Sequence, residues 1–95
     1  MKNPTKLPDI SLIEANFFYD PDLGILYRKS GSPVFNNDRS IGTRKIRVGR
    51  KSTTVARICW ALFYRKDPGS RHIVKHINED PFDNRIDNLR LVRIH

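Results

Sequence analysis

A histidine and an asparagine that could act together lie twelve residues apart in this 95-residue chain, at His76 and Asn88. The loop between them carries Pro81 and the pair Asp83-Asn84, which are typical of ordered turns and helix caps. We therefore expect a strand ending at His76, an ordered loop, and a helix starting near Asn88, so that imidazole and carboxamide face each other. Such an imidazole can take a proton from water as a general base. The alternative is that it holds the loop through a hydrogen bond to the backbone.

The stretch resembles the core of the phage-type HNH endonucleases. That core reads approximately Asp/Asn-His-Ile-Asn-Gly-Asp, two residues, Asp-Asn-Arg, two residues, and Asn-Leu-Arg. Ten residues of this chain match it in register: His76, Ile77, Asn78, Asp80, Asp83, Asn84, Arg85, Asn88, Leu89 and Arg90. Residues 19–27 also resemble the opening hairpin of the family, and residues 57–60 resemble the helix before its core. The resemblance covers about residues 17 to 93.

The resemblance implies the fold and the roles of the two site residues. The expected architecture is α+β, a small single domain over residues 11–95 that follows a flexible N-terminal arm over residues 1–10. It contains a β-hairpin, a helix, and a strand-loop-helix core of the ββα-metal type. In that core His76 would be the general base, and Asn88 would orient it.

The chain departs from the family where the family binds a divalent metal. Lys75 stands where an Asp ligand is common, Ala56 where a His usually precedes Arg57, and Glu79 where the loop has glycine. The second metal ligand of the family would lie on a helix past His95. A lysine has no acceptor atom and repels a cation that needs oxygen ligands. We therefore predict no metal site and no cofactor, with Mg²⁺ or Mn²⁺ implied only if the protein is an active nuclease.

Positive charge predicts a polyanionic partner. The chain has 18 Lys and Arg against 10 Asp and Glu, and residues 39–66 include no acidic residue. A solvated basic surface is the alternative, but DNA is the expected partner. A hairpin at residues 43–56 would fit the major groove as a two-stranded ribbon. The predicted nucleic-acid-binding residues are Arg44, Lys45, Arg47, Arg50, Lys51, Arg57, Lys75, Arg85 and Arg90.

Other sequence features exclude several classes of site. A single cysteine, Cys59, excludes an internal disulfide and the paired-cysteine zinc sites. The three histidines lie at positions 72, 76 and 95, and a histidine-only metal site is not expected. The chain has no apolar stretch of spanning length and no signal peptide, which predicts a cytoplasmic protein without membrane contact. The resemblance implies that it is a phage protein in a bacterial host cell.

Hydrophobic periodicity predicts the remaining elements. A first helix should begin at Asp9 or Ser11 and include Phe17, followed by a turn at 19–24, a strand at 25–29 and a surface loop at 30–40. In the hairpin at 43–56, alternation places Ile46 and Val48 on the core. A second helix near residues 55–65 should bury one stripe of side chains, namely Val55, Ile58, Cys59 and Leu62.

The sequence thus predicts an HNH-fold nucleic-acid-binding protein whose nuclease activity is lost or severely weakened. One alternative is an active, metal-dependent HNH nicking endonuclease. Another is an inhibitor or interaction protein that a phage derived from an HNH nuclease and that binds a host protein. Its docking surface would be Leu91, Val92 and Ile94, for which core packing is the competing interpretation. The target sequence, the choice between DNA and RNA, and the oligomeric state stay open.

Overall fold

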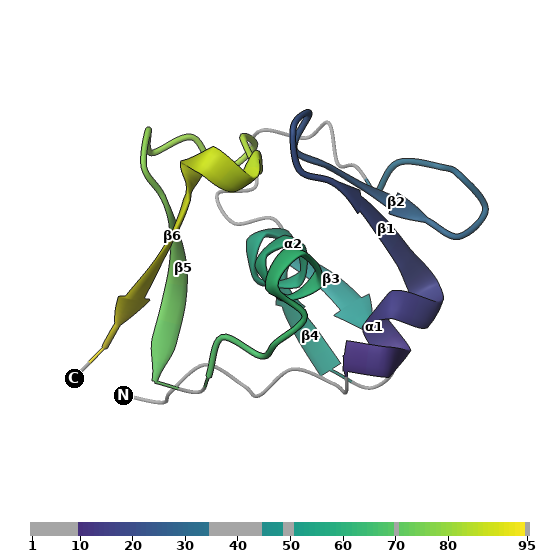
Figure 1. The fold of residues 1–95 in the computed structure, drawn as a ribbon, viewed down its shortest axis with the longest axis horizontal. Helices are drawn as coiled ribbons and strands as arrows, with labels where there is room; N and C mark the ends of the chain where they lie inside the picture. The colour runs from purple at the N-terminus through teal and green to yellow at the C-terminus, as the bar shows by residue number, and fades with distance from the viewer. Residues whose placement is uncertain (1–9, 35–44, 49–50, 70, 95) are drawn as a thin grey trace.

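The computed structural model describes residues 10–34, 45–48, 51–69 and 71–94, without the side chains of Lys45, Arg47, Lys51 and Ser52. In these ranges the chain forms two α-helices, one 3₁₀ turn and six strands, paired into three antiparallel two-stranded sheets. Helix α2 lies in the middle, between the β1–β2 hairpin and the β5–β6 hairpin (Figure 1). The predicted α+β fold class is confirmed. No helix in the described ranges is long and apolar enough to cross a membrane.

Helix α2 (Val55–Tyr64) is the centre of the core. It begins at Thr54, whose side-chain oxygen accepts a hydrogen bond from the Arg57 backbone N–H at 3.2 Å, as an N-cap does. Ile58 and Cys59 are fully buried, as the predicted stripe requires. The burial is nevertheless wider than one stripe, because every residue from 55 to 61 is buried. The helix is covered on several sides by α1, β1, β4, β5 and the 3₁₀ turn.

The N-terminal elements are α1 (Ile10–Asn16), β1 (Phe17–Asp20) and β2 (Ile25–Arg28). Phe17 was expected in the helix, but it is the first residue of β1, where it pairs with Arg28 and is buried. The predicted arm falls on residues outside the described ranges, except for Ile10, which already begins α1. The expected turn is present between β1 and β2, and it ends at Gly24 with φ +71°.

The predicted central hairpin is confirmed as β3 (Lys45–Val48) paired with β4 (Lys51–Thr54). Ile46 and Val48 are 8 % and 3 % exposed, so alternation places them on the core as expected. β4 leads directly into α2, which explains why the hairpin is packed against the first turn of that helix.

The C-terminal hairpin consists of β5 (His72–His76) and β6 (Leu89–Arg93), joined by a loop and the 3₁₀ turn η1 (Ile86–Asn88). The prediction that a helix starts after the loop is wrong: only the 3₁₀ turn η1 is helical, and the chain continues as strand β6. The segment is a strand because Leu89 and Leu91 alternate with Arg90, and it pairs with β5 along its whole length. Leu91 packs against the core, which favours core packing over docking for this residue.

Candidate functional site

The loop between β5 and β6 is held together by Asn88, which is 6 % exposed. Its side-chain oxygen accepts a hydrogen bond from the Asn78 backbone N–H at 3.0 Å. Its amide group donates to the Asn78 side-chain oxygen at 2.9 Å and to the Asp83 carbonyl at 2.8 Å. Asn88 therefore joins the beginning, the middle and the end of the loop.

His76 makes its side-chain hydrogen bond with another residue of the loop than the one predicted. Nε2 of His76 and Oδ1 of Asn84 lie 2.8 Å apart, and Asn84 is 2 % exposed. Asn88 was predicted to orient this histidine, but its carboxamide is occupied by the loop. The sequence assigned the pair Asp83-Asn84 to turn and cap chemistry, and its only other signal was that Asn84 matches the family core.

Asn84 is itself anchored by the first hairpin. The Tyr19 hydroxyl, on β1, donates a hydrogen bond to the Asn84 backbone carbonyl. Burial raises the pKa of Tyr19, and the nearby Cys59 and Asp20 add to the effect, so the hydroxyl keeps the proton that it donates. A residue from outside the predicted core thus fixes the backbone of the residue that contacts His76.

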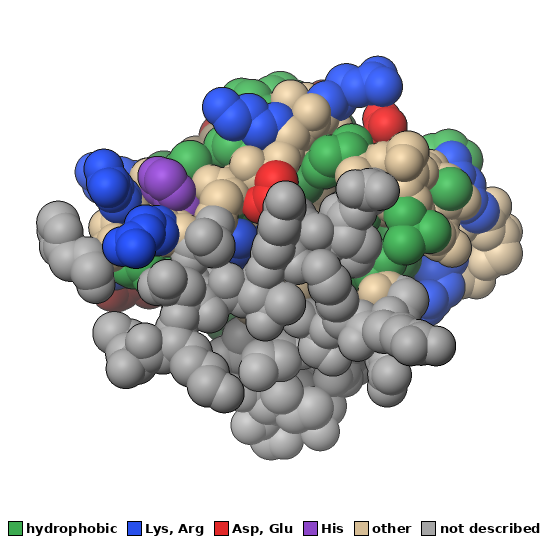
Figure 2. All heavy atoms as spheres, turned by 90° about the horizontal axis from the view of Figure 1, so that it is seen from below, with side chains coloured by type: hydrophobic (Ala, Val, Ile, Leu, Met, Phe, Trp, Pro, Cys, Tyr) green, Lys and Arg blue, Asp and Glu red, His purple; other side chains and the backbone are tan. Residues whose placement is uncertain are grey.

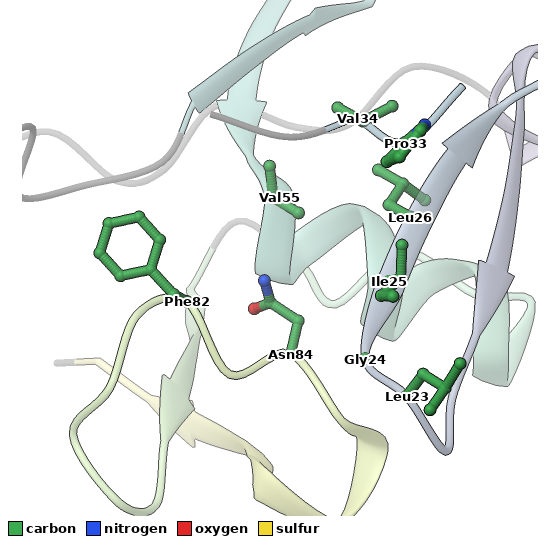
Figure 3. Close-up of a pocket in the computed structure, with 9 residues that line it drawn as sticks. All are labelled: Leu23, Gly24, Ile25, Leu26, Pro33, Val34, Val55, Phe82 and Asn84. Carbon is green, nitrogen blue, oxygen red and sulfur yellow. The ribbon is translucent and has the colours of Figure 1, made fainter. Parts of the chain in front are cut away.

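Asn84 also borders an apolar cavity of about 230 Å³ (Figure 3). Figure 3 shows its side chain extending from the loop toward Val55 at the start of α2. The other lining residues come from the β1–β2 hairpin, the segment after it, α2 and the loop: Leu23, Gly24, Ile25, Leu26, Pro33, Val34, Val55 and Phe82. Since all of their side chains are apolar or absent, this wall offers Asn84 no polar side chain.

On the exposed face of the β5–β6 hairpin, two positively charged side chains lie directly opposite each other. Lys75 on β5 pairs with Arg90 on β6 in the strand register, and both side chains are exposed. Together with His76 they border an open hollow of about 710 Å³, which Glu79 also lines. Within the described residues no ion pair joins Lys75 or Arg90 to a carboxylate. The two cations are therefore available to an anion.

Arg85 is a less available cation. Its guanidinium donates to both carboxylate oxygens of Asp83 at 2.8 Å, and its own side chain is 56 % exposed. The side-chain hydrogen bond from Arg85 lowers the pKa of Asp83 to about 2, and the carboxylate in turn raises the pKa of Arg85. A phosphate would have to share this guanidinium with Asp83.

Arg57 is too buried to be one of the predicted nucleic-acid-binding residues. It was predicted to bind nucleic acid, but it is 5 % exposed, and its guanidinium donates to the carbonyls of His72 at 2.6 Å and Gly69 at 3.0 Å. It lies 4.0 Å from a carboxylate oxygen of Asp67. These bonds fix the connection between α2 and β5, so Arg57 has a structural position. Burial lowers its pKa, and Asp67 opposes that effect.

The ribbon interface stays a prediction. Arg44 and Arg50 lie outside the described residues, and the side chains of Lys45, Arg47 and Lys51 are not described. On the face that Figure 2 shows, Lys and Arg side chains lie at both ends and along the upper edge, with Asp and Glu side chains between them. Charge alone therefore selects no single patch on that face.

The absence of a metal site stays a prediction, and the charges next to His76 bear on it. In the described ranges no group of three or more His, Cys, Asp or Glu side chains comes close enough to hold one. At the position before His76 stands the ammonium of Lys75, with the guanidinium of Arg90 across from it. Two exposed cations repel a divalent ion and supply no oxygen ligand.

Comparison with known protein families gives a match to part of the chain. Residues 54–94 match the family model described as HNH endonuclease. This range contains α2, β5, the loop and β6, but not the β1–β2 hairpin with Tyr19. No curated protein and no solved structure matches the chain.

Proposed function

We propose, on the premise that residues 54–94 match the family model described as HNH endonuclease, that the protein binds nucleic acid, duplex DNA first, with phosphodiester cleavage lost or severely weakened. The proposed contact is the outer face of the β5–β6 hairpin, where Lys75 and Arg90 border the hollow beside His76.

The paired cations carry this proposal. Like charges directly opposite each other on two strands destabilise a hairpin, yet Lys75 and Arg90 occupy such positions with both side chains exposed. A phosphate placed between them would offset part of this positive charge and reduce the repulsion between the two side chains. Arg90 can donate two parallel hydrogen bonds to phosphate oxygens, and Lys75 acts as a compact point charge. The net charge of +8 adds a general attraction to DNA.

Weak cleavage follows from the same two residues. Hydrolysis of a phosphodiester needs an activated water and stabilisation of the charge on the leaving oxygen, which a metal ion supplies in metal-dependent nucleases. Lys75 and Arg90 offer charge to the phosphate, but no Lewis acid. His76 retains a proton-accepting group beside the hollow. The arrangement therefore supports phosphate binding better than bond cleavage.

Binding is tested by fluorescence anisotropy with a labelled DNA duplex over a series of salt concentrations. The double variant Lys75→Glu with Arg90→Glu should bind more weakly, and its log–log salt slope should be shallower by about 0.9, because one phosphate contact is lost and each contributes about 0.9. The matched control is Arg28→Glu with Lys29→Glu, which makes the same charge change at two exposed residues on the β2 side of the molecule. An equal loss in both variants, or salt-independent binding, argues against the hairpin face.

Cleavage is tested by plasmid nicking with Mg²⁺ and with Mn²⁺. The unmodified protein should not exceed a His76→Ala control with either ion. Robust Mg²⁺-dependent nicking that the His76→Ala change abolishes would establish the active endonuclease instead.

A further inference from the structure

The β1–β2 hairpin contacts the loop that carries the site, although it lies outside residues 54–94, the range that the family model matches. Two hydrogen bonds join them: the Tyr19 hydroxyl donates to the Asn84 carbonyl, and the Ile86 backbone N–H donates to the Pro21 carbonyl at 3.0 Å. The bonds lie on either side of one short stretch of the loop. They attach the backbone of Asn84 and of Ile86 to the hairpin, with Arg85 between them, so the backbone of the residue whose side chain reaches His76 is fixed.

The approach is so close that Gly24 has no room for a side chain. A Cβ atom there would lie 2.4 Å from the Arg85 backbone nitrogen, which adjoins Asn84 in the chain. Backbone packs against backbone at this point, so the loop cannot shift without moving the hairpin turn. The position of Asn84 is thus determined by a second part of the fold.

The bond between Asn84 and His76 specifies a tautomer. A carboxamide oxygen only accepts hydrogen bonds, so Nε2 of His76 must carry the hydrogen that lies toward Oδ1 of Asn84, 2.8 Å away. In the neutral imidazole the other nitrogen, Nδ1, then holds the lone pair. The apolar wall of the cavity beside Asn84 offers its side chain no competing polar side chain.

We propose that Asn84 and Tyr19 are positioning residues for His76: Asn84 holds the imidazole as the Nε2–H tautomer with Nδ1 as the proton-accepting atom, and Tyr19 fixes Asn84 in place. The use of that atom toward a phosphodiester rests on the proposed function, whereas the tautomer itself does not. Asn88 has a different role, because its carboxamide bonds to Asn78 and Asp83 within the loop and not to His76.

A merely structural Asn84 makes a different prediction. If its side chain only filled space in the loop, removing it would loosen the loop and leave the ring nitrogens of His76 indifferent to the change. If it positions the imidazole, the identity of the protonated nitrogen must depend on an acceptor at residue 84. A spectroscopic measurement on the ring nitrogens separates these two cases.

The test is long-range ¹H–¹⁵N NMR of the His76 ring in DNA-free protein, at a pH where the imidazole is neutral. The unmodified protein should show Nε2 protonated and Nδ1 unprotonated. Asn84→Ala should shift the Nε2 signal toward the unprotonated range as the two tautomers mix. Asn84→Asp keeps an acceptor oxygen and should restore the original pattern. Tyr19→Phe, which removes only the hydroxyl, should give a smaller shift in the same direction.

Two results overturn the inference: Nδ1 protonated in the unmodified protein, or a His76 pattern that Asn84→Ala leaves unchanged while the backbone amides of β5 and β6 remain folded. The first needs no variant, so the inference stays decidable even if Asn84→Ala does not fold. The NMR measurement is made on DNA-free protein, so it is independent of the binding experiment. It can contradict the tautomer while salt-dependent DNA binding is observed, and DNA binding can be absent while the tautomer is as expected.

Discussion

The β1–β2 and β5–β6 hairpins both reverse the direction of the chain, but their connections differ greatly in length. Residues 21–24 connect β1 to β2, and residues 77–88 connect β5 to β6. The short connection is closed locally. The Asp20 carboxylate accepts from the backbone N–H groups of Asp22 and Leu23, both at 3.0 Å, and the Gly24 N–H donates to the Asp20 carbonyl at 2.8 Å. The bonds that close this connection all lie within residues 20–24.

The long connection depends on side chains and on its neighbour. Asn78, Asp83 and Asn88 bond to one another or to the loop backbone, and η1 ends it. Ordering twelve residues loses more conformational entropy than ordering four, so more bonds are needed to offset the loss. The comparison shows that the short turn is closed by its own hydrogen bonds. The same hairpin also contacts the long loop, which carries the candidate chemistry.

Removal of the Asn88 carboxamide should break the long connection first. Asn88→Ala deletes three hydrogen bonds and leaves the Asn78 N–H and the Asp83 carbonyl without that partner. We expect the free energy of unfolding to fall by about 3 kcal/mol, since each buried polar group left unpaired costs ~1–3 kcal/mol. Urea denaturation measures it. Asn16→Ala, which removes a single exposed bond to the Leu12 carbonyl, is the control and should change little. A loss for Asn88→Ala as small as that of the control would contradict the comparison.

The contact between the two connections is tested at Gly24. Gly24→Ala places a Cβ atom 2.4 Å from the Arg85 nitrogen and also strains a backbone at φ +71°. Gly31→Ala has the second penalty alone, since φ is +96° and nothing lies within 4 Å of its added Cβ. Backbone strain costs about 1–2 kcal/mol in both. Thermal unfolding should show Gly24→Ala to be the more destabilised of the two. Equal losses of stability would mean that the hairpin turn can move away from the Arg85 backbone without cost.

Much of the fold could be predicted because its signals are local. Alternation identified Ile46 and Val48 on β3, and periodicity identified the helix with Cys59 in its buried stripe. The strand ending at His76 followed from the apolar residues before it. Each of these signals lies within a few residues of the structure it predicts.

The rest depends on contacts between distant parts of the chain. Arg57 looked like a surface cation because its partners, the carbonyls of Gly69 and His72, are backbone atoms that a sequence pattern does not show. Asn84 and Asn88 are identical side chains in one loop, but Asn84 bonds to His76 and, through its carbonyl, to Tyr19 of a distant hairpin, whereas Asn88 bonds within the loop. Local patterns name both asparagines, but they do not divide the roles between them.

Relief of strain in the long loop should stabilise it. Glu79 has φ +65°, a left-handed conformation at the position where the family core has glycine. Glu79→Gly should raise the free energy of unfolding by about 1 kcal/mol, the lower end of the usual strain. Glu79→Ala removes the same carboxylate but keeps the strain, so it separates charge from conformation. If both variants are equally stable in urea, the backbone at residue 79 is not strained. Both should bind duplex DNA more tightly, because Glu79 borders the hollow with Lys75 and Arg90.

The smallest expected effect is the acid sensitivity of the ion pair at the loop. The pKa of Asp83 is lowered from 3.8 to about 2, chiefly by the side-chain hydrogen bond from Arg85. Because the folded-state pKa is below the unfolded one, the pair stabilises the fold above about pH 4, and the contribution is lost as the pH falls toward about 2.

Asp83→Asn should therefore flatten the fall in the free energy of unfolding over that acid range, while Asp87→Asn, an exposed carboxylate beside it, serves as the control. The difference should be small and should shrink with added salt, because Arg85 is in contact with solvent. Urea denaturation across this pH range measures it. Equal acid slopes for the unmodified protein and Asp83→Asn at low salt would mean that the loop is held by its amides alone, with Asn78 and Asn88 sufficient for its order.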